Sequence, residues 1–154
     1  MLPKTLYLEV TNRCNLRCRG CIRYRGGWES ERDLSLEEFL RITDQLPDLE
    51  RAVLHGIGEP LLNRDLPAMI HHLKGRPVTV LFNSNGLLLD EKKQHELIDS
   101  GLDELRVSLD AASPEGYKAL RNSRQFDRLV ENLRTMASRL KSCGLKRPKL
   151  SLWF

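Results

Sequence analysis

The chain has 154 residues, 40% of them hydrophobic and 30% charged, and its formal net charge is +4. This length fits one domain, and the composition is that of a globular protein that can bury a core. No apolar run approaches the ~18 residues that cross a bilayer, and the start of the chain lacks the apolar segment of a secretory signal. Four cysteines without such a signal indicate a reducing, cytoplasmic setting in which thiols bind metals.

The first predicted element is a strand over 6–10, and the loop after it carries three thiols. Cys14, Cys18 and Cys21 have the spacing C-x3-C-x2-C, whereas Cys143 lies far along the chain. Soft thiolates bind zinc, copper(I) or iron–sulfur clusters, and both a structural zinc site and an ordinary four-iron cluster use four protein ligands. Three thiolates leave one iron of a four-iron cluster open. The loop therefore favours a reactive centre, with a zinc site or incidental thiols as the alternative.

Arginines crowd around these cysteines, at Arg13, Arg17, Arg19, Arg23, Arg25 and Arg32. Acidic neighbours such as Glu31 and Asp33 favour a solvated loop with local ion pairs. The alternative is a positive field for an anionic cluster or substrate. Nucleic-acid binding is not favoured, because no recognition helix or stacking platform accompanies the arginines.

Helix and strand patterns alternate along the rest of the chain. A capping box over 35–38 starts a helix that ends at Pro47. Further helices are predicted over 63–73, 90–100, 113 onward and 125–143, and further strands over 51–55, 78–82, 105–109 and 150–154. Apolar strands separated by helices predict an α/β protein with a parallel sheet, either doubly wound or part of a barrel, whose site lies beyond the carboxyl ends of the strands.

Polar or glycine-rich segments follow three of these strands. The second strand leads to His55-Gly56-Ile57-Gly58-Glu59-Pro60, whose glycines let backbone approach a ligand and whose Glu59 can hold a cationic group. The third leads to Asn83-Ser84-Asn85-Gly86, which a tight turn also explains. In the fourth, Ser108 and Asp110 point the same way on an extended chain. We expect His55 and Cys143 to be packed, the histidine with a hydrogen-bond partner.

Taken together, these motifs resemble those of the radical S-adenosylmethionine (radical SAM) enzymes. The cysteine spacing is that of the family's cluster motif, although Gly20 stands where an aromatic residue is common. Gly58-Glu59-Pro60 is similar to the end of a G-G-E-P segment, with Ile57 replacing its first glycine. Ser84-Asn85-Gly86 is similar to T-N-G, and residues 108–111 match S-L-D-A letter for letter.

The resemblance implies a [4Fe–4S] cluster on Cys14, Cys18 and Cys21, whose open iron chelates S-adenosylmethionine. Reduction of the bound cofactor then gives a 5′-deoxyadenosyl radical that abstracts a substrate hydrogen. The resemblance also implies that the cofactor's methionine ammonium contacts the segment of Glu59, and that Ser108 and Asp110 lie near its ribose and carboxylate. The full set of implied cofactor-binding residues is Gly56, Gly58, Glu59, Pro60, Asn83, Asn85, Ser108 and Asp110.

The family's core is a six-stranded partial (β/α) barrel, and this sequence supplies about five strands. We therefore expect residues 1–154 to form one such domain, truncated before the sixth strand. The resemblance further implies a flavodoxin- or ferredoxin-like reductant and, from the style of the motifs, a peptide or cofactor precursor as substrate. The alternatives are a non-catalytic cluster- or zinc-binding module and, less favoured, a basic module that binds an anionic partner such as RNA.

Overall fold

The computed structural model describes residues 2–24 and 30–154. Five parallel strands form one sheet whose spatial order follows the chain, β1-β2-β3-β4-β5. The strands are β1 (Thr5–Tyr7), β2 (Arg51–Val53), β3 (Thr79–Ser84), β4 (Glu104–Ser108) and β5 (Lys149–Trp153). Because sequential strands are neighbours and the sheet does not close, this is an open segment of a parallel barrel. The predicted fold class is confirmed.

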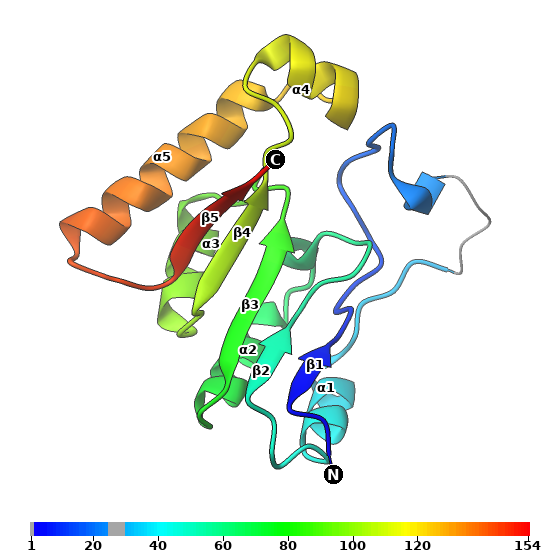
Figure 1. Ribbon diagram of the computed structural model, residues 1–154, viewed down its shortest axis with the longest axis vertical. Coiled ribbons are helices and arrows are strands. Elements are labelled where there is room, and N and C mark those ends of the chain that lie inside the picture. The colour runs from blue at the N-terminus through cyan, green and yellow to red at the C-terminus, as the bar shows by residue number, and fades with distance from the viewer. Residues whose placement is uncertain (1, 25–29) are drawn as a thin grey trace.

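Helices connect consecutive strands; all but α4 pack on one side of the sheet, and α4 lies beyond its carboxyl edge (Figure 1). They are α1 (Leu36–Thr43), α2 (Leu66–Lys74), α3 (Glu91–Asp99), α4 (Pro114–Arg121) and α5 (Phe126–Ser142), with single 3-10 turns η1 (Ile22–Tyr24) and η2 (Pro60–Leu62). In Figure 1 the strand arrowheads point toward the end of the molecule where α4 and the cysteine loop lie. That end is the carboxyl edge of the sheet.

The core lies between the sheet and its helices. Alternate residues of the central strands point into it, among them Ala52, Val80, Phe82, Leu105 and Val107, and they meet the buried faces of α1, α2 and α5. The residues between them face the opposite side of the sheet, where Leu81 is buried but Asn83 and Arg106 are polar. This polar face borders the site described below.

The predicted elements all form, with shifts at their ends. The first strand stops at Tyr7 because the chain then leaves the sheet, and Thr11 forms an antiparallel bridge with Asp33 instead. The helix predicted from Asn63 begins at Leu66, since the Asn63 side chain bonds to the backbone of other segments. The prediction that Cys143 is packed is wrong: it is exposed at the end of α5.

Candidate functional site

A pocket of about 530 Å³ opens at the carboxyl edge of the sheet. Its volume lies within the range of small-molecule and cofactor sites. The lining includes the cysteine loop, the segments after β2, β3 and β4, and the last turn of α4. Ten of the predicted site residues line it, namely Cys14, Cys18, Cys21, Gly56, Gly58, Glu59, Asn83, Asn85, Ser108 and Asp110. Pro60 is buried as the first residue of η2 and does not line the pocket.

Local contacts place the three thiols on the pocket wall. Leu16 is 5% exposed and anchors the loop in the core, and its amide donates to Cys14 Sγ at 3.5 Å. A turn in which the Cys21 amide donates to the Cys18 carbonyl at 3.1 Å brings the last two cysteines together. Burial raises the pKa of the Cys14 thiol. Within 2–24 and 30–154, no three His, Cys, Asp or Glu side chains are grouped to hold a single metal ion.

Arg121, at the end of α4, is a site residue that the sequence analysis did not identify. Its Nη1 lies 3.6 Å from Cys18 Sγ and its Nη2 donates to the Ser108 carbonyl at 3.0 Å. Its Nε lies 2.7 Å from Asp110 Oδ2, an ion pair without a well-aligned hydrogen bond. The side chain is 14% exposed. Nothing in the helical pattern of 114–121 distinguishes this arginine, because only the fold brings α4 against the cysteine loop.

The backbone at Asp110 differs from the extended chain that was expected at the end of β4. The strand ends at Ser108, and Asp110 has φ 59°, in the left-handed region that non-glycine residues seldom adopt. The chain is therefore not extended from Ser108 to Asp110, as the sequence analysis assumed. Both residues still line the pocket, with the Asp110 carboxylate turned to Arg121.

The glycines after β2 serve contacts between loops. A Cβ at Gly58 would lie 2.1 Å from the Thr11 carbonyl oxygen and 2.7 Å from that of Arg13, so only glycine fits there. The neighbouring Glu59 amide donates to the Arg13 carbonyl at 2.7 Å. The sequence analysis expected this glycine to let the backbone approach a ligand. At Gly58 the backbone instead approaches the entrance of the cysteine loop.

Glu59 reaches across the site to the segment after β3. Its side chain accepts from the Ser84 hydroxyl and the Asn85 amide, each at 2.7 Å, and from the Leu61 amide at 3.2 Å. It is 2% exposed, and burial raises the pKa of this carboxyl, against the opposing effect of its hydrogen bonds. The carboxylate therefore orders protein backbone at the edge of the pocket.

Asn85 continues this connection to the cysteine loop. Its side-chain Nδ2 donates to Asn15 Oδ1 at 2.8 Å, and its Oδ1 accepts from the Leu87 backbone amide at 3.0 Å. Asn83 and His55 also line the pocket. Each has a buried polar atom, Oδ1 and Nδ1 respectively, without a hydrogen-bond partner among the described residues. At Nδ1, the partner predicted for His55 is thus not found in the part of the chain that the structure describes. Burial, and then the charge of Arg106, lowers the pKa of His55.

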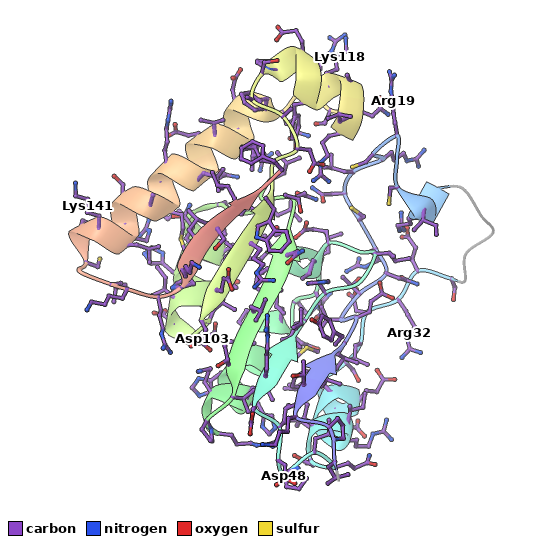
Figure 2. The ribbon with its side chains drawn as sticks, in the orientation of Figure 1. Arg19, Arg32, Asp48, Asp103, Lys118 and Lys141 are labelled. Carbon is purple, nitrogen blue, oxygen red and sulfur yellow. The ribbon has the colours of Figure 1, made fainter. Side chains whose placement is uncertain are left out.

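Several arginines near the cysteines form ion pairs, as the favoured interpretation predicted. Arg13 pairs with Asp33, Arg23 with Glu31 and Arg32 with Glu38, and Arg25 lies outside the described residues. Exposed Arg19 and Lys118 lie at the same end of the molecule (Figure 2). There the Arg19 amide donates to the carbonyl of Leu120 at 3.1 Å, which ties the cysteine loop to α4.

The radical SAM superfamily model matches residues 8–145, a span that includes every motif of the pocket. The chain belongs to the radical SAM superfamily. It is 37% identical over 111 residues to a tungsten-containing aldehyde ferredoxin oxidoreductase cofactor-modifying protein of Pyrococcus furiosus, covering 70% of this chain and 31% of that protein. It is 33% identical over 122 residues to a PqqA peptide cyclase of Granulibacter bethesdensis, covering 77% and 32%.

Among solved structures, SuiB of Streptococcus suis bound to S-adenosylmethionine matches with a TM-score of 0.77 at 19% identity, covering 98% of this chain and 33% of that one. At this identity the likeness shows the radical SAM fold. The chain spans less than half the length of these curated relatives, from 31% of the Pyrococcus furiosus protein to 44% of a probable GTP 3',8-cyclase of Methanocaldococcus jannaschii. In the part of the chain that the structure describes, no helix is long and apolar enough to cross a membrane.

The residues present fit the cofactors that the superfamily uses. Cys14, Cys18 and Cys21 are free thiols on one pocket wall, the soft donor set that iron–sulfur clusters require. Arg121 supplies positive charge next to one of these sulfurs. The orphaned polar atoms of His55 and Asn83 lie at a pocket large enough for a cofactor.

Proposed function

We propose that this chain holds a [4Fe–4S] cluster on Cys14, Cys18 and Cys21 and cleaves S-adenosylmethionine reductively for hydrogen abstraction from a substrate. The observation that carries the proposal is the convergence on one pocket of all three thiols and the segments that follow β2, β3 and β4. When bound, the cluster and cofactor would supply the electron and the 5′-deoxyadenosyl radical. The protein's own part is binding, orientation and electrostatics.

The residues proposed to bind the cofactor remain those of the sequence analysis. Gly56, Asn83 and Ser108 line the pocket from three different strand ends and can contact a ligand directly. Glu59 would act through the Asn85 segment that it orders, since its carboxylate oxygens accept from protein groups. Pro60 would act as the rigid start of η2. The remaining pocket residues of the set are Gly58, Asn85 and Asp110.

The substrate class proposed is a peptide or cofactor precursor. The names of two relatives, a cofactor-modifying protein and a peptide cyclase, support this class. We propose a flavodoxin- or ferredoxin-like protein as reductant and the cytoplasm as the compartment. Exposed basic residues beside the cysteine loop, such as Arg19 and Lys118, are compatible with an acidic redox partner.

The test is anaerobic reconstitution with iron and sulfide, followed by electron paramagnetic resonance of the reduced protein with and without S-adenosylmethionine. We expect a [4Fe–4S] signal that changes on adding the cofactor, together with 5′-deoxyadenosine as a product. Cys18→Ser should abolish both, whereas Cys143→Ser, outside the pocket, should keep them. Zinc uptake, or a signal unaffected by the cofactor, would overturn the proposal.

A second candidate is a module that binds a cluster or zinc without turnover. The observation favouring it is that the Glu59 side chain, which the resemblance places at the cofactor's ammonium, accepts from Ser84, Asn85 and Leu61 of the protein itself. It predicts a bound metal centre without 5′-deoxyadenosine. The same reconstitution therefore separates the two candidates.

A further inference from the structure

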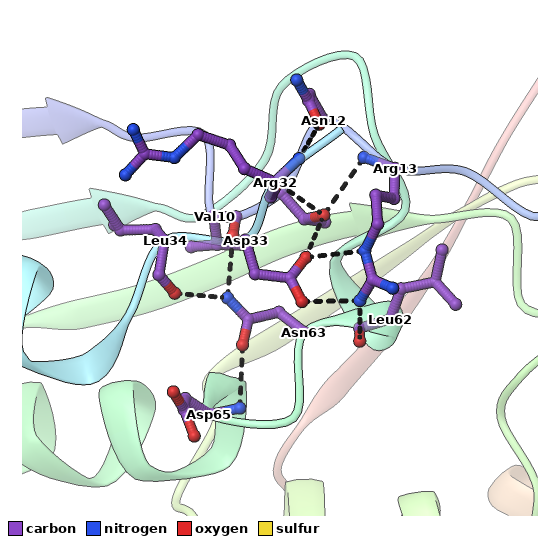
Figure 3. A network of polar contacts seen from close by, with 10 residues as sticks. Val10, Asn12, Arg13, Arg32, Asp33, Leu34, Leu62, Asn63 and Asp65 are labelled. Carbon is purple, nitrogen blue, oxygen red and sulfur yellow. Dashed lines mark hydrogen bonds and ion pairs between the residues drawn. The ribbon is translucent and has the colours of Figure 1, made fainter. Parts of the chain in front are cut away.

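A compact polar network lies at the base of the cysteine loop, among residues that do not line the pocket (Figure 3). Arg13, next to Cys14, donates from Nε to Asp33 Oδ1 at 2.9 Å and from Nη2 to Asp33 Oδ2 at 2.5 Å. The same Nη2 donates to the Leu62 carbonyl at 3.1 Å. A two-pronged arginine–carboxylate pair is directional as well as charged, so it fixes orientation better than a single ion pair does.

Thr11 completes the pair from within the core. This residue is 3% exposed, and its hydroxyl donates to Asp33 Oδ1 at 2.6 Å and accepts from the Arg13 amide at 3.1 Å. The Arg13 carbonyl in turn accepts from the Glu59 amide at 2.7 Å. The residue before the first cysteine is thus held through its amide, its carbonyl and its guanidinium.

Asn63 binds the same two segments a few residues away. Its Nδ2 donates to the Val10 carbonyl at 2.7 Å and to the Leu34 carbonyl at 2.9 Å, and its Oδ1 accepts from the Asp65 amide at 2.8 Å. This side chain is 1% exposed. We refer to Thr11, Arg13, Asp33 and Asn63 together as the base clasp.

The clasp joins the two ends of one excursion of the chain. Residues 10–13 enter the cysteine loop, and residues 32–34 leave it. Backbone bonds from the Leu34 amide to the Val10 carbonyl at 2.9 Å and from the Asn12 amide to the Arg32 carbonyl at 3.3 Å run alongside the clasp. All three cysteines therefore lie within a loop whose ends are joined by contacts between protein groups alone.

We propose that the base clasp is a positioning device that pre-organises the cysteine loop for its metal centre, with Asp33 as its central residue. Closing a loop costs conformational entropy, and a loop whose ends protein contacts hold together does not incur that cost when the centre forms. Asp33 accepts from both Thr11 and Arg13. Its loss would remove the link that Thr11 and Arg13 make from the entrance of the loop to its exit, and would leave the Asn63 and backbone bonds to hold the two ends. The proposal rests on the proposed function only for the statement that the metal centre is a [4Fe–4S] cluster.

The test is Asp33→Asn in the full chain, which keeps the size of the side chain and removes its charge. In the metal-free protein we expect alkylation of Cys14, Cys18 and Cys21 by iodoacetamide to accelerate about tenfold, the effect of losing one charge-assisted hydrogen-bonded pair. Exposed Cys143 should react at an unchanged rate and serves as the internal reference. In the reconstituted protein, a chelator should remove iron from the variant faster.

The matched control is Glu38→Gln, which breaks the neighbouring Arg32–Glu38 ion pair while glutamine keeps the capping box. We expect wild-type alkylation from it. Should Asp33→Asn fail to fold, Arg13→Lys keeps the charge but not the fork, and an intermediate rate is expected. The proposal would be overturned by equally accelerated alkylation of Cys143. It would also be overturned by unchanged alkylation rates of the three loop cysteines in both clasp variants. Because alkylation uses metal-free protein, this result is independent of whether the proposed enzymatic function holds.

Discussion

At the scale of single residues, some polar side chains of the site are open to the pocket, and others form hydrogen bonds within the protein. Glu59 and Asn85 use their hydrogen bonds to join the segments after β2 and β3 to each other and to the cysteine loop. Arg121 joins the end of β4 to Cys18. Ordering of this kind lets short loops present backbone and thiol groups in fixed positions, which binding sites require.

Arg121→Gln should make the midpoint potential of a reconstituted cluster more negative. The guanidinium lies 3.6 Å from Cys18 Sγ, and a cationic donor to a ligand sulfur stabilises the reduced, more negative cluster. We expect a shift of about 60 mV, the one-electron equivalent of a tenfold change in equilibrium constant. Potentiometric titration followed by paramagnetic resonance measures it. Arg124→Gln, on the exposed turn that follows, is the control, and an equal shift there would refute the assignment.

Glu59→Gln should change how stability depends on pH. Burial raises the pKa of Glu59 above 4.5, so between that value and its folded-state pKa the folded chain keeps a proton that the unfolded chain has lost. The contribution of Glu59 to the free energy of unfolding therefore falls as pH rises through this window. Glutamine does not titrate, so the variant lacks this pH-dependent contribution. Urea titrations from pH 4 upward should show wild type losing stability relative to the variant, and a constant or growing wild-type advantage would contradict this.

At the scale of elements, the site depends on loops that pack against one another at the carboxyl edge of the sheet. The segment after β2 lies against the entrance of the cysteine loop, where the Glu59 amide bonds to the Arg13 carbonyl. The last turn of α4 lies against the middle of that loop, where the Leu120 carbonyl accepts from Arg19. These contacts are between backbone atoms, so they depend on how closely the two backbone segments approach each other.

Gly58→Ala should destabilise the protein by about 1–3 kcal/mol, the usual cost of overpacking. The added methyl would lie 2.1 Å from the Thr11 carbonyl oxygen, which cannot move without displacing the cysteine loop. Urea unfolding measures the change. Gly20→Ala is the matched control for stability, because a Cβ there meets nothing within 4 Å. Equal stability of the two variants would show that the loops move apart without a loss in the free energy of unfolding.

At the scale of the whole molecule, the sheet has two unpaired edges, the three-residue β1 and the longer β5. The large side chains of Leu152 and Trp153 in β5 and of Phe154 just after it are 48%, 49% and 81% exposed. A parallel sheet is normally covered, and an apolar edge strand is a template for pairing with another chain. The described chain therefore carries an association-prone apolar surface at β5.

The isolated chain should self-associate through β5 as its concentration rises. A second copy can cover the apolar side chains and pair with the open edge. We expect Leu152→Lys to reduce this association, because a charge on an edge strand opposes pairing. Analytical ultracentrifugation over a range of concentrations measures it. Leu145→Lys is the control, since Leu145 is 41% exposed but precedes β5. A wild-type chain that stays monomeric throughout would refute the prediction.

The sequence by itself determined the order of the elements and the residues that meet at the pocket. Apolar strands and amphipathic helices carry their own periodicity, and parallel strands place their carboxyl ends at one edge whatever the details of packing. For that reason Cys14, Asn85 and Ser108, more than twenty residues apart, could be assigned to one site before the fold was known.

Only the tertiary structure decided which polar groups are left open to the pocket and which bind the protein. The role of Glu59 depends on Ser84 and Asn85 in another segment, and the role of Arg121 depends on α4 lying against the cysteine loop. The base clasp likewise pairs Arg13 with Asp33, 20 positions along the chain. Hydrogen bonds between distant segments follow from distances that no local pattern encodes, because side-chain partners are chosen by how the elements pack.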